Sequence, residues 1–121
     1  MITHLLPIAV IFVALEHLGF LVLEMFFWTK PLGMKIFRTT KSVAESSKAL
    51  AANQGLYNGF LSAGLFWGLM IPDQTQAEDT IGFFLACVIV AAIFGAFTVN
   101  KRIFFVQGIP ALIALGLLIL T

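Results

Sequence analysis

The sequence predicts an all-α protein that crosses a membrane with four helices packed into one compact bundle. The chain has 121 residues, of which 60% are apolar and 11% are charged, and its mean hydropathy is +1.03. A soluble domain of this length does not need so much apolar surface, whereas a polytopic membrane protein does. The apolar stretches lack the alternation of strands, and helices satisfy every backbone group in lipid. We therefore expect one transmembrane domain over residues 1–121.

Four apolar stretches have the length and composition of spanning helices. The first, at about residues 5–28, is long enough to cross a hydrocarbon core of ~30 Å at ~1.5 Å per residue. It lacks a basic start and is too long for a signal peptide, so we expect it to be retained. The others are expected at about residues 50–71, 80–99 and 104–120. A basic loop, an acidic hairpin and a tight turn, at residues 29–49, 72–79 and 100–102, connect the four.

The loop charges predict an orientation. All seven lysine and arginine residues fall in the first and third connections, and the second holds only acidic charges. Since basic loops stay on the cytoplasmic side, we expect an inner or plasma membrane protein with both termini outside. The net charge of +1 gives no reason to expect nucleic-acid binding. Cys87 is the only cysteine, which excludes an internal disulfide and a cysteine-built zinc site.

The basic segment at residues 32–49 mixes Met34, Phe37 and Ala44 with lysines. It is either an interfacial amphipathic helix that touches anionic lipid headgroups or a loop that only fixes the topology. In both cases we expect part of it to extend a neighbouring helix into the cytoplasm.

Three ionisable side chains, Glu16, His17 and Glu24, interrupt the first apolar stretch. Each costs at least ~2.5–3.5 kcal/mol at a helix centre, so such groups normally face partners, water or a ligand. The spacing of seven residues puts His17 and Glu24 on one helix face, whereas Glu16 is turned by ~100° from His17. Counted from the predicted cytoplasmic end, Glu24 lies ~6 Å deep and the other two lie near the midplane.

Polar side chains on the second helix are expected at the same depths. Asn53 and Gln54 are level with Glu24, and Asn58 lies towards the level of His17. A hairpin of the first two helices would gather these groups in the inner half of the membrane. Alternatively, the amides only form interhelical hydrogen bonds, which are worth ~0.6 kcal/mol each. Tyr57 beside the amides and Gln107 at the mouth complete the candidate ligand- or proton-binding set: Glu16, His17, Glu24, Asn53, Gln54, Tyr57, Asn58 and Gln107.

Two glycine repeats follow on the same helix. Gly55 with Gly59, and Gly64 with Gly68, each form a GxxxG pattern. Such patterns let helices approach closely, either within one chain or between two copies.

Four motifs carry a family resemblance: ALEH at residues 14–17, LEMFFW at 23–28, NQGLYNG at 53–59 and QGIPA at 107–111. Together and in this order, they resemble the small bacterial and fungal membrane proteins of domain of unknown function 1304 over nearly the whole chain. The resemblance implies a four-helix integral membrane protein and brings no established activity. It places the family's motif residues at Glu16, His17, Glu24, Asn53, Gln54, Asn58 and Gln107.

Three functions stay open on the sequence. The first is binding or proton-coupled transport of a small molecule by a homodimer, in which Glu16 binds substrate or proton and His17 and Glu24 relay protons. The second is an intramembrane enzyme that uses Glu and His as acid and base on a lipid-like substrate, held by Gln54 and Asn58. The third is a structural or assembly subunit, in which the polar cluster only fixes the bundle.

We expect neither a metal nor a cofactor. The adjacent Glu16 and His17 cannot both point the same way, and no H-x-x-x-H or E-x-x-H spacing occurs. No GxGxxG or P-loop pattern is present either. The expected partners are the lipid bilayer, a small or lipid-like ligand and, for transport, a second copy of the chain.

Overall fold

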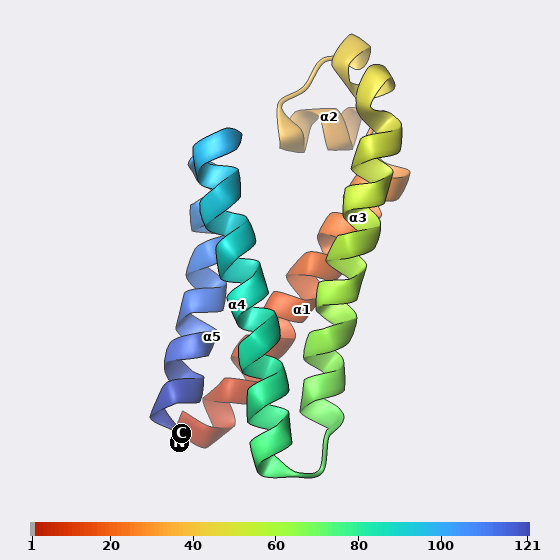
Figure 1. Ribbon diagram of the computed structural model, residues 1–121. Coiled ribbons are helices and arrows are strands. Elements are labelled where there is room, and N and C mark those ends of the chain that lie inside the picture. Colours follow the sequence, from red (N-terminus) through yellow and green to blue (C-terminus); the bar gives the residue numbers. More distant parts are fainter. Residues whose placement is uncertain (1) are drawn as a thin grey trace. The chain divides into compact units, whose positions relative to one another are not determined.

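The computed structural model describes residues 2–121, and helices joined by short turns account for nearly all of them (Figure 1). The elements are α1 Ile2–Phe26, α2 Pro31–Phe37, α3 Lys41–Met70, α4 Gln74–Thr98, the π-helix η1 Phe104–Gly108 and α5 Ile109–Leu120. This described range contains no strand. The all-α prediction is therefore confirmed. Contacts group the chain into two compact units: unit 1 holds the chain up to Glu16 together with Leu61–Thr121, and unit 2 is His17–Phe60.

Two of the helices are long and apolar enough to cross a membrane. They are Thr3–Phe26, within α1, and Gln74–Thr98, which is α4. The stretch Phe104–Leu120 is a shorter apolar helix. The second predicted span falls in the C-terminal part of α3, where three polar amides lower the hydropathy. Of the four predicted spans, two therefore lie in helices that are long and apolar enough to cross a membrane.

The basic segment at residues 29–49 is mostly helical rather than a loop. It contains α2 and the first turns of α3, so one helix more than expected precedes the acidic connection. Thr40 is the N-cap of α3: its Oγ1 accepts a hydrogen bond from the Val43 N–H at 3.3 Å. The expected helical extension of this segment is thus α3, which begins at Lys41.

The acidic connection is shorter than predicted because Asp73 caps α4. Its carboxylate accepts a hydrogen bond from the Gln76 N–H at 3.0 Å, which satisfies one of the free donors of the first turn. As a result, α4 begins at Gln74 rather than near residue 80.

Unit 1 encloses an apolar core between helices that pack closely. Within it, α4 and α5 lie side by side (Figure 1). A Cβ atom on Gly68 of α3 would lie 2.6 Å from Ile81 of α4, so the glycine sets the distance between these helices. The core residues are Val10, Val13, Ala14, Leu65, Ile81, Leu85, Val88, Ala111 and Ala114.

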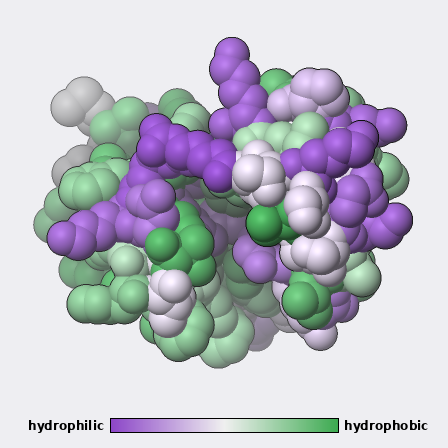
Figure 2. Space-filling model, turned by 90° about the horizontal axis from the view of Figure 1, so that it is seen from above, coloured by the Kyte–Doolittle hydropathy of each residue, from purple (hydrophilic) through white to green (hydrophobic). Residues whose placement is uncertain are grey.

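In unit 2, Trp28 ties the end of α1 to α2 and α3. Its indole N–H donates a hydrogen bond to Ser47 Oγ at 3.1 Å. Its ring lies 4.9 Å from the Phe37 ring, centroid to centroid. Gly33 is buried against the backbone carbonyl of Phe27, so α2 packs on the chain that leaves α1. α2 runs across the direction of α3 (Figure 1), and the view from above shows many hydrophilic side chains mixed with apolar ones (Figure 2).

Candidate functional site

Two ionisable side chains lie on the buried face of α1 in unit 2. His17 is 0% exposed and Glu24 is 4% exposed. Their spacing of seven residues is about two helical turns, so both side chains leave the helix in nearly the same direction. The predicted common face of these two residues is confirmed by their burial. The His17 ring packs edge-on against Phe20, with 5.3 Å between the ring centroids.

Asn58 of α3 supplies the partner of Glu24. Its Nδ2 donates a hydrogen bond to Glu24 Oε1 at 2.5 Å, and its side chain is 8% exposed. Ala51, Gly55 and Asn58 form a buried stripe at helical spacing on α3. The sequence placed Glu24 level with Asn53 and Gln54 instead. The observed register is one turn further along α3.

Glycine makes this close approach of α1 and α3 possible. A Cβ atom on Gly55 would lie 2.9 Å from Met25 Cγ and 3.1 Å from Glu24 Cβ. One on Gly59 would lie 2.6 Å from Leu21 Cδ1. The first GxxxG repeat therefore packs α3 against α1 inside the chain. The second repeat is also intramolecular, since a Cβ atom on Gly64 would overlap the Phe84 ring.

Three of the predicted residues are exposed on α3. They are Asn53, Gln54 and Tyr57. The Tyr57 ring packs edge-on against Phe60 at a centroid distance of 5.7 Å. The side chains that unit 2 brings together on its buried faces are thus Glu24 and Asn58, with His17 on the same side of α1 as Glu24.

Two predicted residues belong to unit 1. Glu16 is half-buried, and its Oε1 atom is buried without a hydrogen-bond partner among residues 2–121. Gln107 is half-buried on η1. The π-turn was not predicted, although Pro110 is a signal for it. Proline has no N–H to donate to the carbonyl four residues back, and just before it the Ile109 N–H donates to the Phe104 carbonyl five residues back.

Comparison with known proteins identifies the family. The model of the family described as "Protein of unknown function (DUF1304)" matches residues 11–119. The chain belongs to this family. An uncharacterized protein, YpaA of Lactococcus lactis subsp. lactis (strain IL1403), is 33% identical over 115 residues, which cover 93% of this chain and 95% of that protein. No solved structure matches.

In this DUF1304 chain the partner of the buried carboxylate is an amide rather than a cation. Asn58 gives Glu24 its hydrogen bond, whereas the ion pair found on α3 joins the exposed side chains of Lys48 and Glu45 at 3.7 Å. Within the described range, no three His, Cys, Asp or Glu side chains lie together as metal ligands. The site therefore offers one buried carboxyl group, a neutral donor that orients it, and a histidine two turns away on α1.

Proposed function

We propose that this DUF1304 protein is an integral membrane protein that binds a proton or a small cationic molecule at Glu24, as the binding step of proton-coupled transport. The observation that carries the proposal is the buried hydrogen bond between Glu24 and Asn58.

The membrane setting is supported by where apolar and polar side chains lie. α4 leaves Phe83, Val90 and Phe94 exposed by 64%, 65% and 69%. Unit 2 buries His17 and Glu24. Water-soluble proteins favour the opposite distribution, whereas a bilayer accepts an apolar exterior and drives polar groups inward. In the proposed topology, α1, the apolar part of α3, α4 and η1–α5 cross the membrane with both termini outside.

The chemistry follows from the charge balance at Glu24. A carboxylate removed from water is costly unless it holds a proton or meets a cation. Asn58 stabilises and orients the group but brings no charge. Glu24 can therefore exchange a proton for a cationic ligand, and His17, ~10 Å along the same face of α1, is the second group able to carry that proton. Glu24 replaces Glu16 as the proposed binding carboxyl because its whole side chain is buried.

The test measures proton release from the purified full-length protein in weakly buffered detergent. Tetraphenylphosphonium serves as the cationic probe, and its binding is followed in parallel by equilibrium dialysis. The wild type is expected to release about one proton per probe bound, and Glu24→Gln to lose both signals. Glu45→Gln is the matched control, since Glu45 is an exposed carboxylate on α3. Probe binding that survives in Glu24→Gln would overturn the proposal.

The same hydrogen bond also favours a structural role. Interhelical hydrogen bonds in membranes average ~0.6 kcal/mol and reach ~2 kcal/mol, enough to help fix two helices. If the folded wild type neither binds the probe nor releases protons, while Asn58→Ala lowers its unfolding temperature, the structural subunit is the better description.

A further inference from the structure

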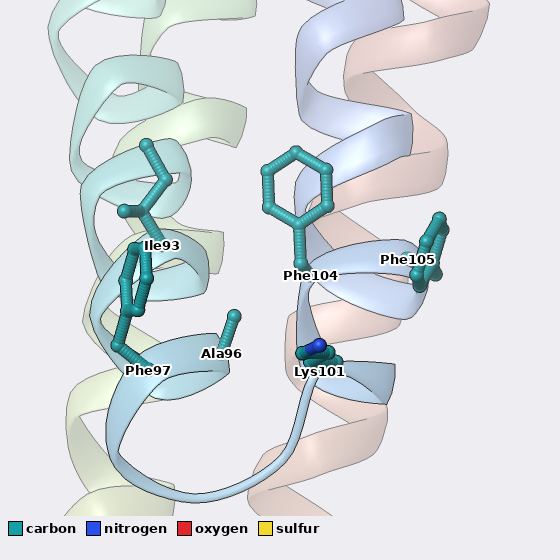
Figure 3. A pocket seen from close by; sticks show the side chains of 6 residues that line it. All are labelled: Ile93, Ala96, Phe97, Lys101, Phe104 and Phe105. Atoms are coloured by element: carbon teal, nitrogen blue, oxygen red, sulfur yellow. The ribbon is translucent and has the colours of Figure 1, made fainter.

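An open apolar groove lies where the end of α4 meets η1 in unit 1 (Figure 3). Its volume is about 320 Å³. The Phe104 ring stands between the two helices, beside the side of α4 that carries Ile93 and Phe97 (Figure 3). The lining residues are Ile93, Ala96, Phe97, Lys101, Phe104 and Phe105. Five of the six are apolar, and the sixth is a cation.

Two glycines lie where α4 and the chain around η1 pack closely beside this groove. A Cβ atom on Gly95 would lie 3.0 Å from Ile103 Cγ2, and one on Gly108 would lie 3.1 Å from Ala92 Cβ. Glycine at both positions therefore lets α4 and the chain around η1 pack closely beside the groove. The groove thus lies beside a close packing of α4 against η1.

A short turn places Lys101 beside the groove. Asn100 Oδ1 accepts a hydrogen bond from the Arg102 N–H at 2.8 Å. The Asn100 N–H donates to the Gly95 carbonyl at 3.0 Å. Lys101 sits between these two anchored residues and is exposed, so its ammonium group is available at the end of the apolar lining.

We propose that this groove binds one anionic phospholipid, with an acyl chain against Phe97 and Phe104 and the phosphate at Lys101. The inference rests on the membrane location proposed above, because only a bilayer supplies such a ligand in excess. Groove and lipid are complementary in charge and polarity: an apolar groove that ends in one ammonium group matches a lipid that joins an acyl chain to one phosphate.

A second groove in the same unit provides an internal comparison. It lies on α4 with a volume of about 500 Å³ and is lined by Phe83, Ala86, Cys87, Val90, Ala91 and Phe94. This lining has no charged residue, so an acyl chain there gains nothing from an anionic headgroup. Headgroup selectivity should therefore come from Lys101.

The experiment is native mass spectrometry of the full-length protein in detergent with equal amounts of phosphatidylglycerol and phosphatidylcholine of the same acyl chains. The wild type should retain phosphatidylglycerol preferentially. Lys101→Gln should lower that retention about fivefold, the effect of one basic residue near an anionic headgroup. Lys35→Gln, which removes an exposed lysine from α2, is the matched control and should leave the preference unchanged.

Filling the groove tests the acyl chain separately. Ala96→Phe should lower retention of both lipids, whereas Ala91→Phe, which makes the same substitution in the uncharged groove, should preserve the preference for phosphatidylglycerol. Circular dichroism of each variant checks that the helices remain. The proposal is overturned if Lys101→Gln keeps the preference, or if Ala96→Phe dissociates a dimer, which would assign the groove to a second copy.

The lipid experiment and the proton experiment can fail independently. Glu24→Gln is expected to retain phosphatidylglycerol as the wild type does. Lipid selectivity without proton release would support the proposed lipid site and contradict only the transport proposal. If the chain stays in solution without detergent, the proposed membrane location is wrong. Both proposals that depend on this location are then wrong as well.

Discussion

The side-chain amide of Asn58 on α3 donates a hydrogen bond to the carboxyl group of Glu24 on α1, joining residues 34 positions apart in the chain. Both side chains are buried, where a polar group left without a hydrogen bond is costly. The pair both holds two helix segments of unit 2 together and presents the carboxyl group that we propose as a binding site. Substitutions can separate these two roles.

Removing the donor should destabilise the protein more than neutralising the acceptor. Asn58→Leu leaves the Glu24 carboxyl buried without a partner, at an expected cost of ~1–3 kcal/mol in the free energy of unfolding. Glu24→Gln keeps an acceptor for the Asn58 amide and should cost less than ~1 kcal/mol. Denaturant unfolding in detergent, followed by circular dichroism, measures both changes.

The double variant provides the control for this pair. Glu24→Leu removes the acceptor altogether, so if the hydrogen bond is the reason for the loss, the costs of Asn58→Leu and Glu24→Leu should not add. Strict additivity would mean that the two residues do not interact and would contradict the observed contact.

Two glycines on the helices of unit 2 should respond to alanine with opposite signs. Gly55→Ala would place a Cβ atom 3.2 Å from the Leu21 carbonyl oxygen, which is backbone and cannot move aside. We expect a loss of ~1–3 kcal/mol. A Cβ atom added at Gly19 would meet no neighbouring group within 4 Å, so Gly19→Ala should gain up to ~1 kcal/mol from helix propensity alone.

The unfolding temperatures of the two alanine variants give the measurement. Because a Cβ atom added at Gly55 would also lie 3.1 Å from Glu24 Cβ, Gly55→Ala should lower probe binding at Glu24 as well, while Gly19→Ala should not. Equal responses of the two variants would show that α1 and α3 do not approach closely at Gly55.

Helical periodicity was sufficient to predict the buried face of α1. His17 and Glu24 recur at seven residues, and that spacing holds for any straight helix. The partner of Glu24 on α3 was harder to predict. The pairing of residues between α1 and α3 was estimated from their depths, and each depth depends on the residue at which the counting along that helix begins. Depth measured from Trp28 and Leu50 paired Glu24 with Asn53 and Gln54, whereas close packing at Gly55 selects Asn58.

The short elements could not be read from the sequence for a different reason. α2 has seven residues, too few for a periodic pattern, and it is held by the contact of Trp28 with Phe37 and by the burial of Gly33. Helices this short gain their stability from tertiary packing rather than from propensity. Four motifs, by contrast, were sufficient to predict the DUF1304 family, which the match over residues 11–119 confirms.

The end of α2 offers a test of local backbone strain. Arg38 follows the helix with φ 54° and ψ 47°, the left-handed conformation that favours glycine. Arg38→Gly should therefore raise the free energy of unfolding by ~0.5–1 kcal/mol. Lys35→Gly, placed inside α2, should lower it by up to ~1 kcal/mol. Thermal unfolding distinguishes the two, and a loss of stability in Arg38→Gly would contradict the assigned conformation.

The proposed topology makes a labelling prediction that depends on the single cysteine. In a Cys87→Ser background, Ser46→Cys introduces a thiol at the exposed start of α3 and Thr75→Cys introduces one at the exposed start of α4. Because the basic residues of the first and third connections should stay inside, a membrane-impermeant maleimide is expected to label Thr75→Cys in intact cells. Ser46→Cys should react only after lysis. The reverse pattern would invert the topology, and labelling of both before lysis would place the start of α3 outside.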